Sequence, residues 1–208
     1  YLEPHHPDLL DFLELRKNTG YENDRCRDLF TALMVSDLFM NRVDNNLDWS
    51  FFDPSVCNDL NELWGEEYEN KYIEYEEEDK AIKKIPARDI WARIISSQIE
   101  TGTPYMLYKD TINRYNNQCN LGTIKSSNLC AEITEYSDNK EYACCTLGSI
   151  GLPKCIENNK FNFDKLGDVV KIMVKNLNRV IDLNYYPVEE AKISNMKHRP
   201  IGIGIQGL

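Results

Sequence analysis

Three side chains with complementary chemistry stand two residues apart near the middle of the sequence: the amide of Asn128, the thiol of Cys130 and the carboxylate of Glu132. Successive side chains of an extended segment point to opposite faces, so residues two and four apart share a face. Residues two apart on a helix do not face one another. The spacing therefore predicts a strand or an extended loop over 126–133 on which the three groups converge. A thiol beside a carboxylate base and a hydrogen-bonding amide could remove protons and hydrogen atoms from a small substrate.

The alternative for Cys130 is an ordinary core residue, because a lone cysteine is most often a small buried hydrophobe. Two polar residues flank it on the same expected face, and burying them without a purpose would be costly. The trio therefore favours an active site, although a five-residue Asn-x-Cys-x-Glu pattern also arises by chance.

A second pair of thiols, Cys144 and Cys145, lies on the next expected strand, where Cys145 follows Cys130 by fifteen residues. A βαβ crossover needs a dozen or more residues, so the two strands are expected to pair as a hairpin or to cross nearby. Either arrangement brings Cys145 close to Cys130. The alternative is that both are core thiols. A zinc site is disfavoured, because the Cys-x-x-Cys or His-x-x-x-His spacing is absent and His5 and His6 are adjacent.

Two other patterns resemble binding sites. The acidic residues of 66–79 could suggest a metal cluster, but a solvated helix face is the better interpretation. Residues 202–207 have the Gly-x-Gly-x-x-Gly spacing of a dinucleotide-binding turn, which needs a following helix and a later acidic residue. We prefer a tightly packed barrel strand in which glycine permits close backbone approach.

Composition excludes several classes of protein. The 208 residues can bury a full core, and the formal charge of −10 argues against binding a nucleic-acid backbone. No stretch reaches the apolar length of a membrane span. Seven scattered cysteines favour reduced, cytoplasmic thiols over a disulfide scaffold. The sequence starts without Met and stops in the apolar run 200–208, so we interpret it as a fragment of a longer chain.

Apolar spacing predicts helices separated by short extended runs. The expected helices are one from Leu9 to a cap at 18–20, one or two within 24–43, an acidic helix over 65–80, one from Ile90 to Gly102, and the strongest over 164–183 with Asp164 as N-cap. The expected extended runs are 48–52, 104–108, 125–133, 142–150 and 200–206. This alternation predicts an α/β fold with mainly parallel strands, whose cysteine-bearing strands lie in the middle as a buried site requires.

The run Ser-Ser-Asn-Leu-Cys-Ala-Glu-Ile (126–133) resembles the active-site signature of the large, catalytic subunit of class I ribonucleotide reductase, of the type found in eukaryotes and their large DNA viruses. Further blocks resemble the same family, at 1–4, 27–30, 37–40, 64–67, 101–110, 120–125 and 199–208. The resemblance covers the whole chain. It implies that 1–208 is part of a single catalytic domain, a ten-stranded α/β barrel with the radical cysteine on a loop reaching into its centre.

The resemblance also implies roles. Cys130 stands where the family keeps its thiyl-radical cysteine, Asn128 and Glu132 where it keeps the substrate-contacting amide and the base. Cys145 stands where the family has one of two cysteines that reduce the substrate by forming a disulfide. The implied enzyme reduces ribonucleoside diphosphates to 2′-deoxyribonucleoside diphosphates for DNA precursor synthesis.

The cofactors and partners implied by the resemblance lie outside this chain. No metal or cofactor is expected within it, because a di-iron tyrosyl-radical small subunit supplies the radical, and ATP and dNTP effectors bind elsewhere in the parent protein. The implied partners are a ribonucleoside diphosphate, the small subunit, thioredoxin or glutaredoxin, and further copies of the parent chain. Neither nucleic acid nor a membrane is expected as a partner.

The sequence departs from the family in three ways. The partner cysteine of Cys145 lies outside the chain, His5 stands where relatives usually carry Trp, and Cys144 where they usually carry an apolar residue. The resemblance also places the N-terminal regulatory domain, the effector site, the phosphate-gripping loop, the tyrosine pair for radical entry and the C-terminal cysteine tail outside this chain. The fragment alone is therefore expected to be inactive. Two alternatives remain: an adenosylcobalamin-dependent reductase, which the blocks around Thr101 and Arg199 disfavour, and a non-catalytic paralogue acting as a scaffold, which would typically lose the cysteines and the base.

Overall fold

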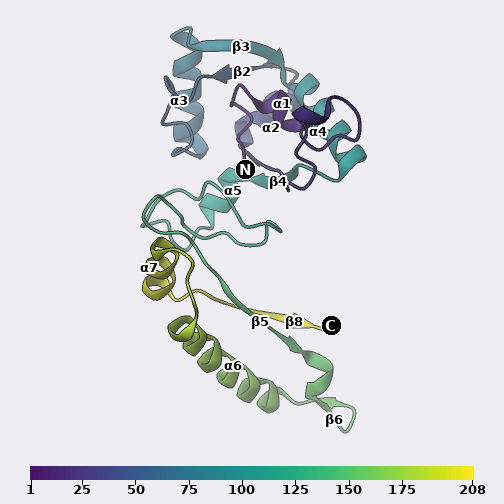
Figure 1. Ribbon diagram of the computed structural model, residues 1–208, viewed down its shortest axis with the longest axis vertical. Coiled ribbons are helices and arrows are strands. Elements are labelled where there is room, and N and C mark those ends of the chain that lie inside the picture. The colour runs from purple at the N-terminus through teal and green to yellow at the C-terminus, as the bar shows by residue number, and fades with distance from the viewer. The chain divides into compact units, whose positions relative to one another are not determined.

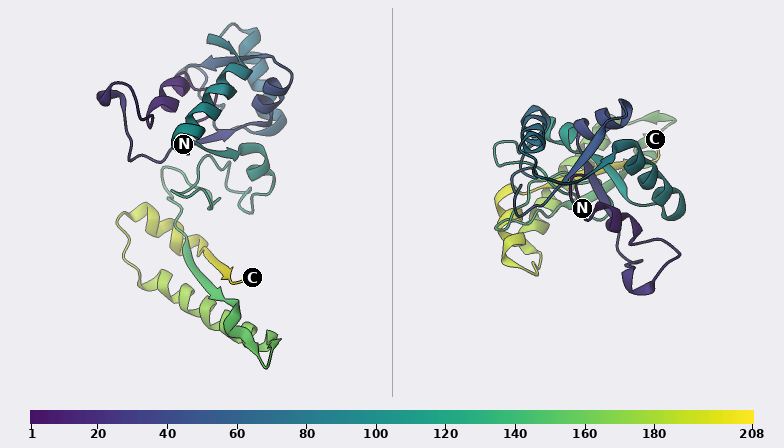
Figure 2. Two further views of the ribbon diagram at one scale, coloured as in Figure 1. Left: turned by 90° about the vertical axis from the view of Figure 1, so that its right-hand side faces the viewer. Right: turned by 90° about the horizontal axis from the view of Figure 1, so that it is seen from above.

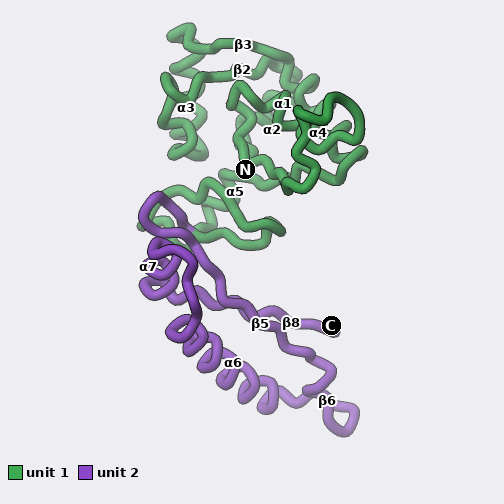
Figure 3. The backbone as a smooth tube through the Cα atoms, viewed as in Figure 1, with its two compact units in different colours: residues 1–135 green, residues 136–208 purple.

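A computed structural model describes residues 1–208, which divide into two compact units, 1–135 and 136–208 (Figure 3). Unit 1 contains α1 (Leu9–Glu14), η1 (Glu22–Asp24), β1 (Ala32–Val35), α2 (Asp37–Asp44), β2 (Asp48–Phe52), α3 (Gly65–Glu77), β3 (Ala81–Pro86), α4 (Ala87–Thr101), β4 (Tyr105–Tyr108) and α5 (Lys109–Arg114) (Figure 1). Unit 2 contains β5 (Thr146–Gly151), η2 (Leu152–Cys155), β6 (Ile156–Glu157), β7 (Lys160–Phe161), α6 (Phe163–Leu183), α7 (Glu189–His198) and β8 (Ile201–Gln206).

The buried strand β1 organises the first sheet of unit 1. It pairs in parallel with β4, from Ala32 opposite Tyr105 to Val35 opposite Tyr108. On its other side runs the start of the chain, where the Leu2 amide donates to the Ala32 carbonyl at 3.0 Å and the Leu2 carbonyl accepts from the Met34 amide at 2.9 Å. The first residues are therefore held against a buried strand.

An aromatic core supports the second sheet of unit 1, the antiparallel pair β2–β3. Trp49 is fully buried, stacks on Tyr72 at 4.5 Å between ring centroids and meets the edge of Phe39 at 4.9 Å. Helix α3 supplies Tyr72 and the buried Tyr68 from one face. The acidic helix predicted over 65–80 is confirmed, and its tyrosine face enters the core.

Two helix predictions in unit 1 need correction. The prediction of one or two helices within 24–43 is confirmed only for α2 and is wrong for 32–35, which form β1 and are all buried. A short apolar run buried on both faces has no periodicity that separates a strand from a helix. The helix resumes only at α2, where the Ser36 hydroxyl accepts from the Phe39 amide at 3.2 Å. Helix α1 ends at Glu14, before the predicted cap at 18–20.

Unit 2 is built on a parallel pair, β5 and β8, in register from Thr146 opposite Ile201. A Cβ atom at Gly202 would lie 2.7 Å from Leu147 Cδ2, so a larger residue there would require the end of the Leu147 side chain to shift. The strand interpretation of this run is confirmed for residues 202–206, which lie in β8, whereas Gly207 follows the strand with a left-handed φ of 75°. Helix α6 packs along β5 (Figures 1 and 2), and a Cβ at Gly148 would lie 3.1 Å from the sulfur of Met173.

The strongest predicted helix is confirmed as α6, but its cap is not Asp164. The side chain of Asn162 accepts from the Lys165 amide at 2.9 Å, so Asn162 is the N-cap. Of the extended run 142–150, only the part from Thr146 onward forms a strand.

The predicted α/β class with parallel pairing is confirmed by β1–β4 and β5–β8, whereas β2–β3 and β6–β7 are antiparallel. All four sheets have two strands, so no barrel closes within these residues. The single-domain interpretation of 1–208 stays a prediction. No helix combines the length and apolar character needed to cross a membrane.

Candidate active site

The segment that carries the predicted site residues is a turn, so the prediction of a strand or an extended loop over 126–133 is wrong. The Asn128 carbonyl accepts from the Ala131 amide at 3.2 Å, and Ala131 has a left-handed φ of 64°. The side-chain oxygen of Asn128 accepts from the backbone amides of Glu132 at 3.1 Å and of Ile133 at 3.2 Å. Asparagine side chains compete in this way with sheet hydrogen bonding. The three residues thus lie on one turn and not on a strand, and the convergence of their side chains stays a prediction.

The exposure of these residues differs from that of the buried site expected from the sequence. Cys130 and Glu132 are exposed and Asn128 is half-buried. Cys145 is half-buried and belongs to unit 2, immediately before β5. Its predicted strand pairing with 125–133 is wrong, because β5 pairs with β8. The predicted proximity of Cys145 to Cys130 stays a prediction.

Two side chains that the sequence did not single out contact the turn. The Tyr1 hydroxyl donates to the Asn128 carbonyl at 2.7 Å. The Ser127 hydroxyl lies 3.2 Å from the Asn128 side-chain oxygen and also donates to the carbonyl of Ile133. Burial raises the pKa of Tyr1, a hydrogen bond with Ser127 opposes the shift, and the nearby Glu132 and Cys130 add to it. Tyr1 belongs to a block that resembles the family, yet nothing in its local sequence indicates this contact.

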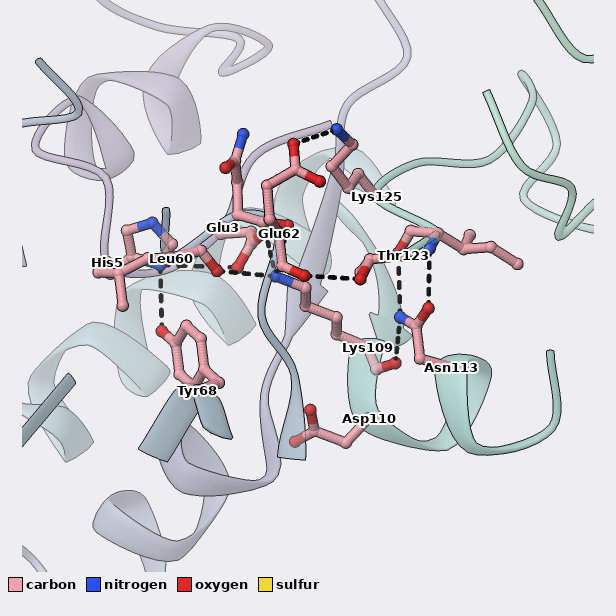
Figure 4. A network of polar contacts seen from close by, with 12 residues as sticks. Glu3, His5, Leu60, Glu62, Tyr68, Lys109, Asp110, Asn113, Thr123 and Lys125 are labelled. Carbon is pink, nitrogen blue, oxygen red and sulfur yellow. Dashed lines mark hydrogen bonds and ion pairs between the residues drawn. The ribbon is translucent and has the colours of Figure 1, made fainter. Parts of the chain in front are cut away.

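A buried polar network is centred on Lys109 at the start of α5 (Figure 4). The Lys109 side chain is completely buried, and its ammonium donates to Glu3 Oε1 at 2.7 Å, to the Leu60 carbonyl at 3.2 Å and to the Asn61 carbonyl at 3.1 Å. All three ammonium protons therefore have acceptors.

Burial shifts the titration of the groups around Lys109. Desolvation raises the pKa of Glu3 to about 7, although the ammonium of Lys109 opposes the shift. Desolvation lowers the pKa of Lys109 itself. His5 lies 3.0 Å from the Tyr68 hydroxyl, and burial, followed by the charge of Lys109, lowers its pKa to about 3. His5 is therefore a neutral core residue at pH 7.

The same network fixes the residues that enter the turn. The Asn113 side chain donates to the Ile124 carbonyl at 3.0 Å and accepts from the Ile124 amide at 2.7 Å. On either side of Ile124, the Thr123 hydroxyl donates to the Glu62 carbonyl at 2.6 Å and the Lys125 ammonium contacts the Glu62 carboxylate at 2.5 Å. Residues 123–125 are thus anchored immediately before 126–133.

We expect the substitution His5→Phe to make stability fall with rising pH. The pKa of Glu3 is raised above its ordinary 4.5, so its stabilising contribution is full below pH 4.5 and is lost as the pH rises to about 7. The pKa of His5 is lowered from 6.5, so its contribution is full above pH 6.5 and is lost as the pH falls to about 3. In the wild type, the fall in stability with rising pH due to Glu3 and the rise due to His5 offset each other between pH 4.5 and 6.5. In the variant only the fall due to Glu3 remains.

The measurement is the free energy of denaturant unfolding of the parent protein from pH 4.5 to 7, as the difference between variant and wild type. The variant should lose up to about 3 kcal/mol relative to the wild type across this range. His6→Phe, at the neighbouring half-buried histidine, is the matched control. A difference between His5→Phe and the wild type that does not change with pH would contradict the opposed titrations.

Comparison with known proteins gives the chain its family. The family described as ribonucleotide reductase, barrel domain, matches residues 1–208. The chain belongs to this family. Its ribonucleotide reductase relatives include the ribonucleoside-diphosphate reductase large subunit of Danio rerio, 57% identical over 209 residues, the large chain of Encephalitozoon cuniculi, 58% identical over 210, and the large subunit of Variola virus, 55% identical over 208.

Each of these matches covers 100% of this chain but only 26% or 27% of the relative. The chain therefore spans about a quarter of the length of the curated relatives that it matches. It is a fragment of the ribonucleotide reductase barrel domain, and the barrel is not closed within it. Cys130 is exposed within this unclosed part of the barrel. The roles of Asn128, Cys130, Glu132 and Cys145 remain predictions.

Proposed function

We propose that the parent protein of this chain reduces ribonucleoside diphosphates to 2′-deoxyribonucleoside diphosphates. The observation that carries the proposal is the turn bearing Asn128, Cys130 and Glu132 within a chain of the ribonucleotide reductase family. The relatives named ribonucleoside-diphosphate reductase, at 53–58% identity, support the same activity.

The chemistry begins at Cys130. A thiyl radical there takes the hydrogen atom from the 3′ carbon of the ribose, a reversible step because an S–H bond and an activated ribose C–H bond are similar in strength. Glu132 accepts the proton of the 3′ hydroxyl while the 2′ hydroxyl leaves as water with a proton from a cysteine thiol. Cys145 and its partner cysteine supply two electrons and end as a disulfide. A positioned general base of this kind contributes about 10²–10⁴-fold.

The side-chain amide of Asn128 has a defined orientation for binding the substrate hydroxyls. Its oxygen accepts from two backbone amides, which leaves the NH₂ group as the part that can donate to the substrate hydroxyls. Enclosure of the turn by the rest of the barrel would exclude water from the radical.

The radical source and the partners are part of the proposal. The relatives are named large subunits or large chains, which supports a small subunit as partner. In this proposal the small subunit carries the di-iron tyrosyl radical, and thioredoxin or glutaredoxin reduces the disulfide. ATP and dNTP effectors bind at sites outside 1–208. Oligomerisation of the parent chain and a cytoplasmic location belong to the same proposal.

The test is the conversion of CDP to dCDP by the full-length parent in the presence of a dithiol reductant. We expect product only when the small subunit is added. Product formed with adenosylcobalamin in place of the small subunit would contradict the class I mechanism. No product under either condition would favour the scaffold alternative.

A further inference from the structure

We propose that Tyr1 is a positioning residue that fixes the turn carrying Asn128, Cys130 and Glu132. Its hydroxyl donates to the Asn128 carbonyl at 2.7 Å, across 127 residues of sequence. The same carbonyl accepts from the Ala131 amide at 3.2 Å and so closes the turn. This inference rests on the proposed function, because it concerns the geometry of that same site.

The residues that follow Tyr1 are held by hydrogen bonds and a buried ion pair of unit 1. The adjacent Leu2 exchanges two backbone hydrogen bonds with β1, at 3.0 and 2.9 Å. The next residue, Glu3, is bound to the buried ammonium of Lys109 at 2.7 Å. A side chain whose backbone is fixed on both a strand and a buried ion pair can define the position of what it binds.

The turn needs such a restraint from outside. Ala131 has a left-handed φ of 64°, a conformation that is uncommon and costly for a residue other than glycine. The side-chain hydrogen bonds of Asn128 are made within the turn itself, whereas Ser127 contacts both the turn and the Tyr1 side chain. The Tyr1 hydroxyl ties the turn to the β1 sheet. Because Glu132 and Cys130 add to the burial that raises the pKa of Tyr1, the phenol lies within electrostatic range of both groups.

A role in positioning predicts a specific kinetic effect. The Tyr1 hydroxyl binds backbone and not substrate, so its loss should leave the KM for CDP within about twofold of the wild type. Without it the Asn128 carbonyl keeps one partner, and the thiol moves from the close approach of about 3–3.5 Å that atom transfer requires. We expect Tyr1→Phe to lower kcat by about 3- to 10-fold, the effect of one neutral hydrogen bond.

The experiment uses the full-length parent with its small subunit and compares Tyr1→Phe with the wild type. Tyr21→Phe is the matched control, because Tyr21 is 72% exposed and lies in the loop before η1. Two further measurements separate positioning from loss of folded enzyme: the ratio of rates with CDP and with 3′-deuterated CDP, and hydrogen exchange of the amides in 126–134. A smaller fraction of folded enzyme changes neither the isotope ratio nor exchange in the folded molecules.

The proposal is supported if Tyr1→Phe lowers kcat, raises the isotope ratio and speeds exchange in 126–134, while Tyr21→Phe does none of these. A lower kcat with an unchanged isotope ratio would overturn it, as would wild-type kcat. If the wild-type parent forms no dCDP, the proposed function fails. Hydrogen exchange then still decides the restraint, since equal exchange in the wild type and in Tyr1→Phe overturns it and faster exchange in the variant supports it.

Discussion

Replacement of Cys130 by Ser in the full-length parent is expected to reduce dCDP formation from CDP to background. An alcohol O–H bond is much stronger than a thiol S–H bond, so a radical delivered from the small subunit cannot be transferred to the serine hydroxyl and no hydrogen abstraction follows. The thiol side chain makes none of the hydrogen bonds that hold the turn, which are formed by Asn128, Ser127 and Tyr1. Folding should therefore be unchanged. The measurement is dCDP by chromatography in the presence of small subunit and dithiol.

Cys26→Ser and Cys119→Ser are matched controls, because both cysteines are exposed and lie in the same unit as Cys130. Both variants should turn over CDP at close to the wild-type rate. Wild-type turnover by Cys130→Ser would contradict the assignment of the radical to this residue and favour a scaffold role for the chain. A lower midpoint of thermal unfolding for Cys130→Ser alone would show that the loss arises from folding and not from chemistry.

The elements predicted well from the sequence are those whose signals are local. Helix α4 has a regular apolar stripe and ends where Gly102 adopts a φ of 75°, as its cap position requires. Strand β8 follows from alternating glycine and isoleucine, and its glycine at position 202 lies directly against the Leu147 side chain. Periodicity and glycine are properties of a few neighbouring residues and can be read directly.

The elements predicted wrongly depend on partners that are distant in sequence. Strand β1 resembles a helix because its apolar run is covered on both faces by residues outside the window that the pattern describes. The turn that carries the site forms because the Asn128 side-chain oxygen accepts from the backbone amides of residues 132 and 133, which in a strand would donate to a neighbouring strand. The pattern Asn-x-Cys-x-Glu indicates the same chemistry on a strand or on a turn. These residues could therefore be predicted as a site although the predicted backbone conformation was wrong.

The buried network around Lys109 could not be predicted at all. Lys109 and Glu3 are 106 residues apart, and lysine and glutamate are seldom fully buried unless they are paired. Without the fold, each would be assigned to the surface. In the structure the network around them anchors the residues that precede the turn. Its disruption is the substitution from which we expect the largest loss of stability.

We expect Lys109→Met to lower the unfolding free energy of the parent protein by about 3–5 kcal/mol at pH 8, because removing one partner of a buried ion pair leaves the other uncompensated. Methionine fills much of the lysine volume, so packing is largely retained. The lost contacts are those to Glu3 and to the carbonyls of Leu60 and Asn61. Without the ammonium that now opposes desolvation, the pKa of Glu3 should rise further above about 7. The measurement is denaturant unfolding of variant and wild type at several pH values.

The pH dependence of the loss distinguishes a buried charge from lost packing. A group whose pKa is raised by folding stabilises the protein at low pH and loses that contribution as the pH rises. At pH 5 Glu3 is protonated in the variant, and the loss should shrink to the unsatisfied carbonyls, about 1–3 kcal/mol. Lys171→Met removes an exposed lysine that pairs with Asp168 at 3.2 Å, and it should change stability by less than about 1 kcal/mol at either pH. Equal losses for Lys109→Met at pH 5 and pH 8 would show that Lys109 acts through its packed side chain and not through its charge.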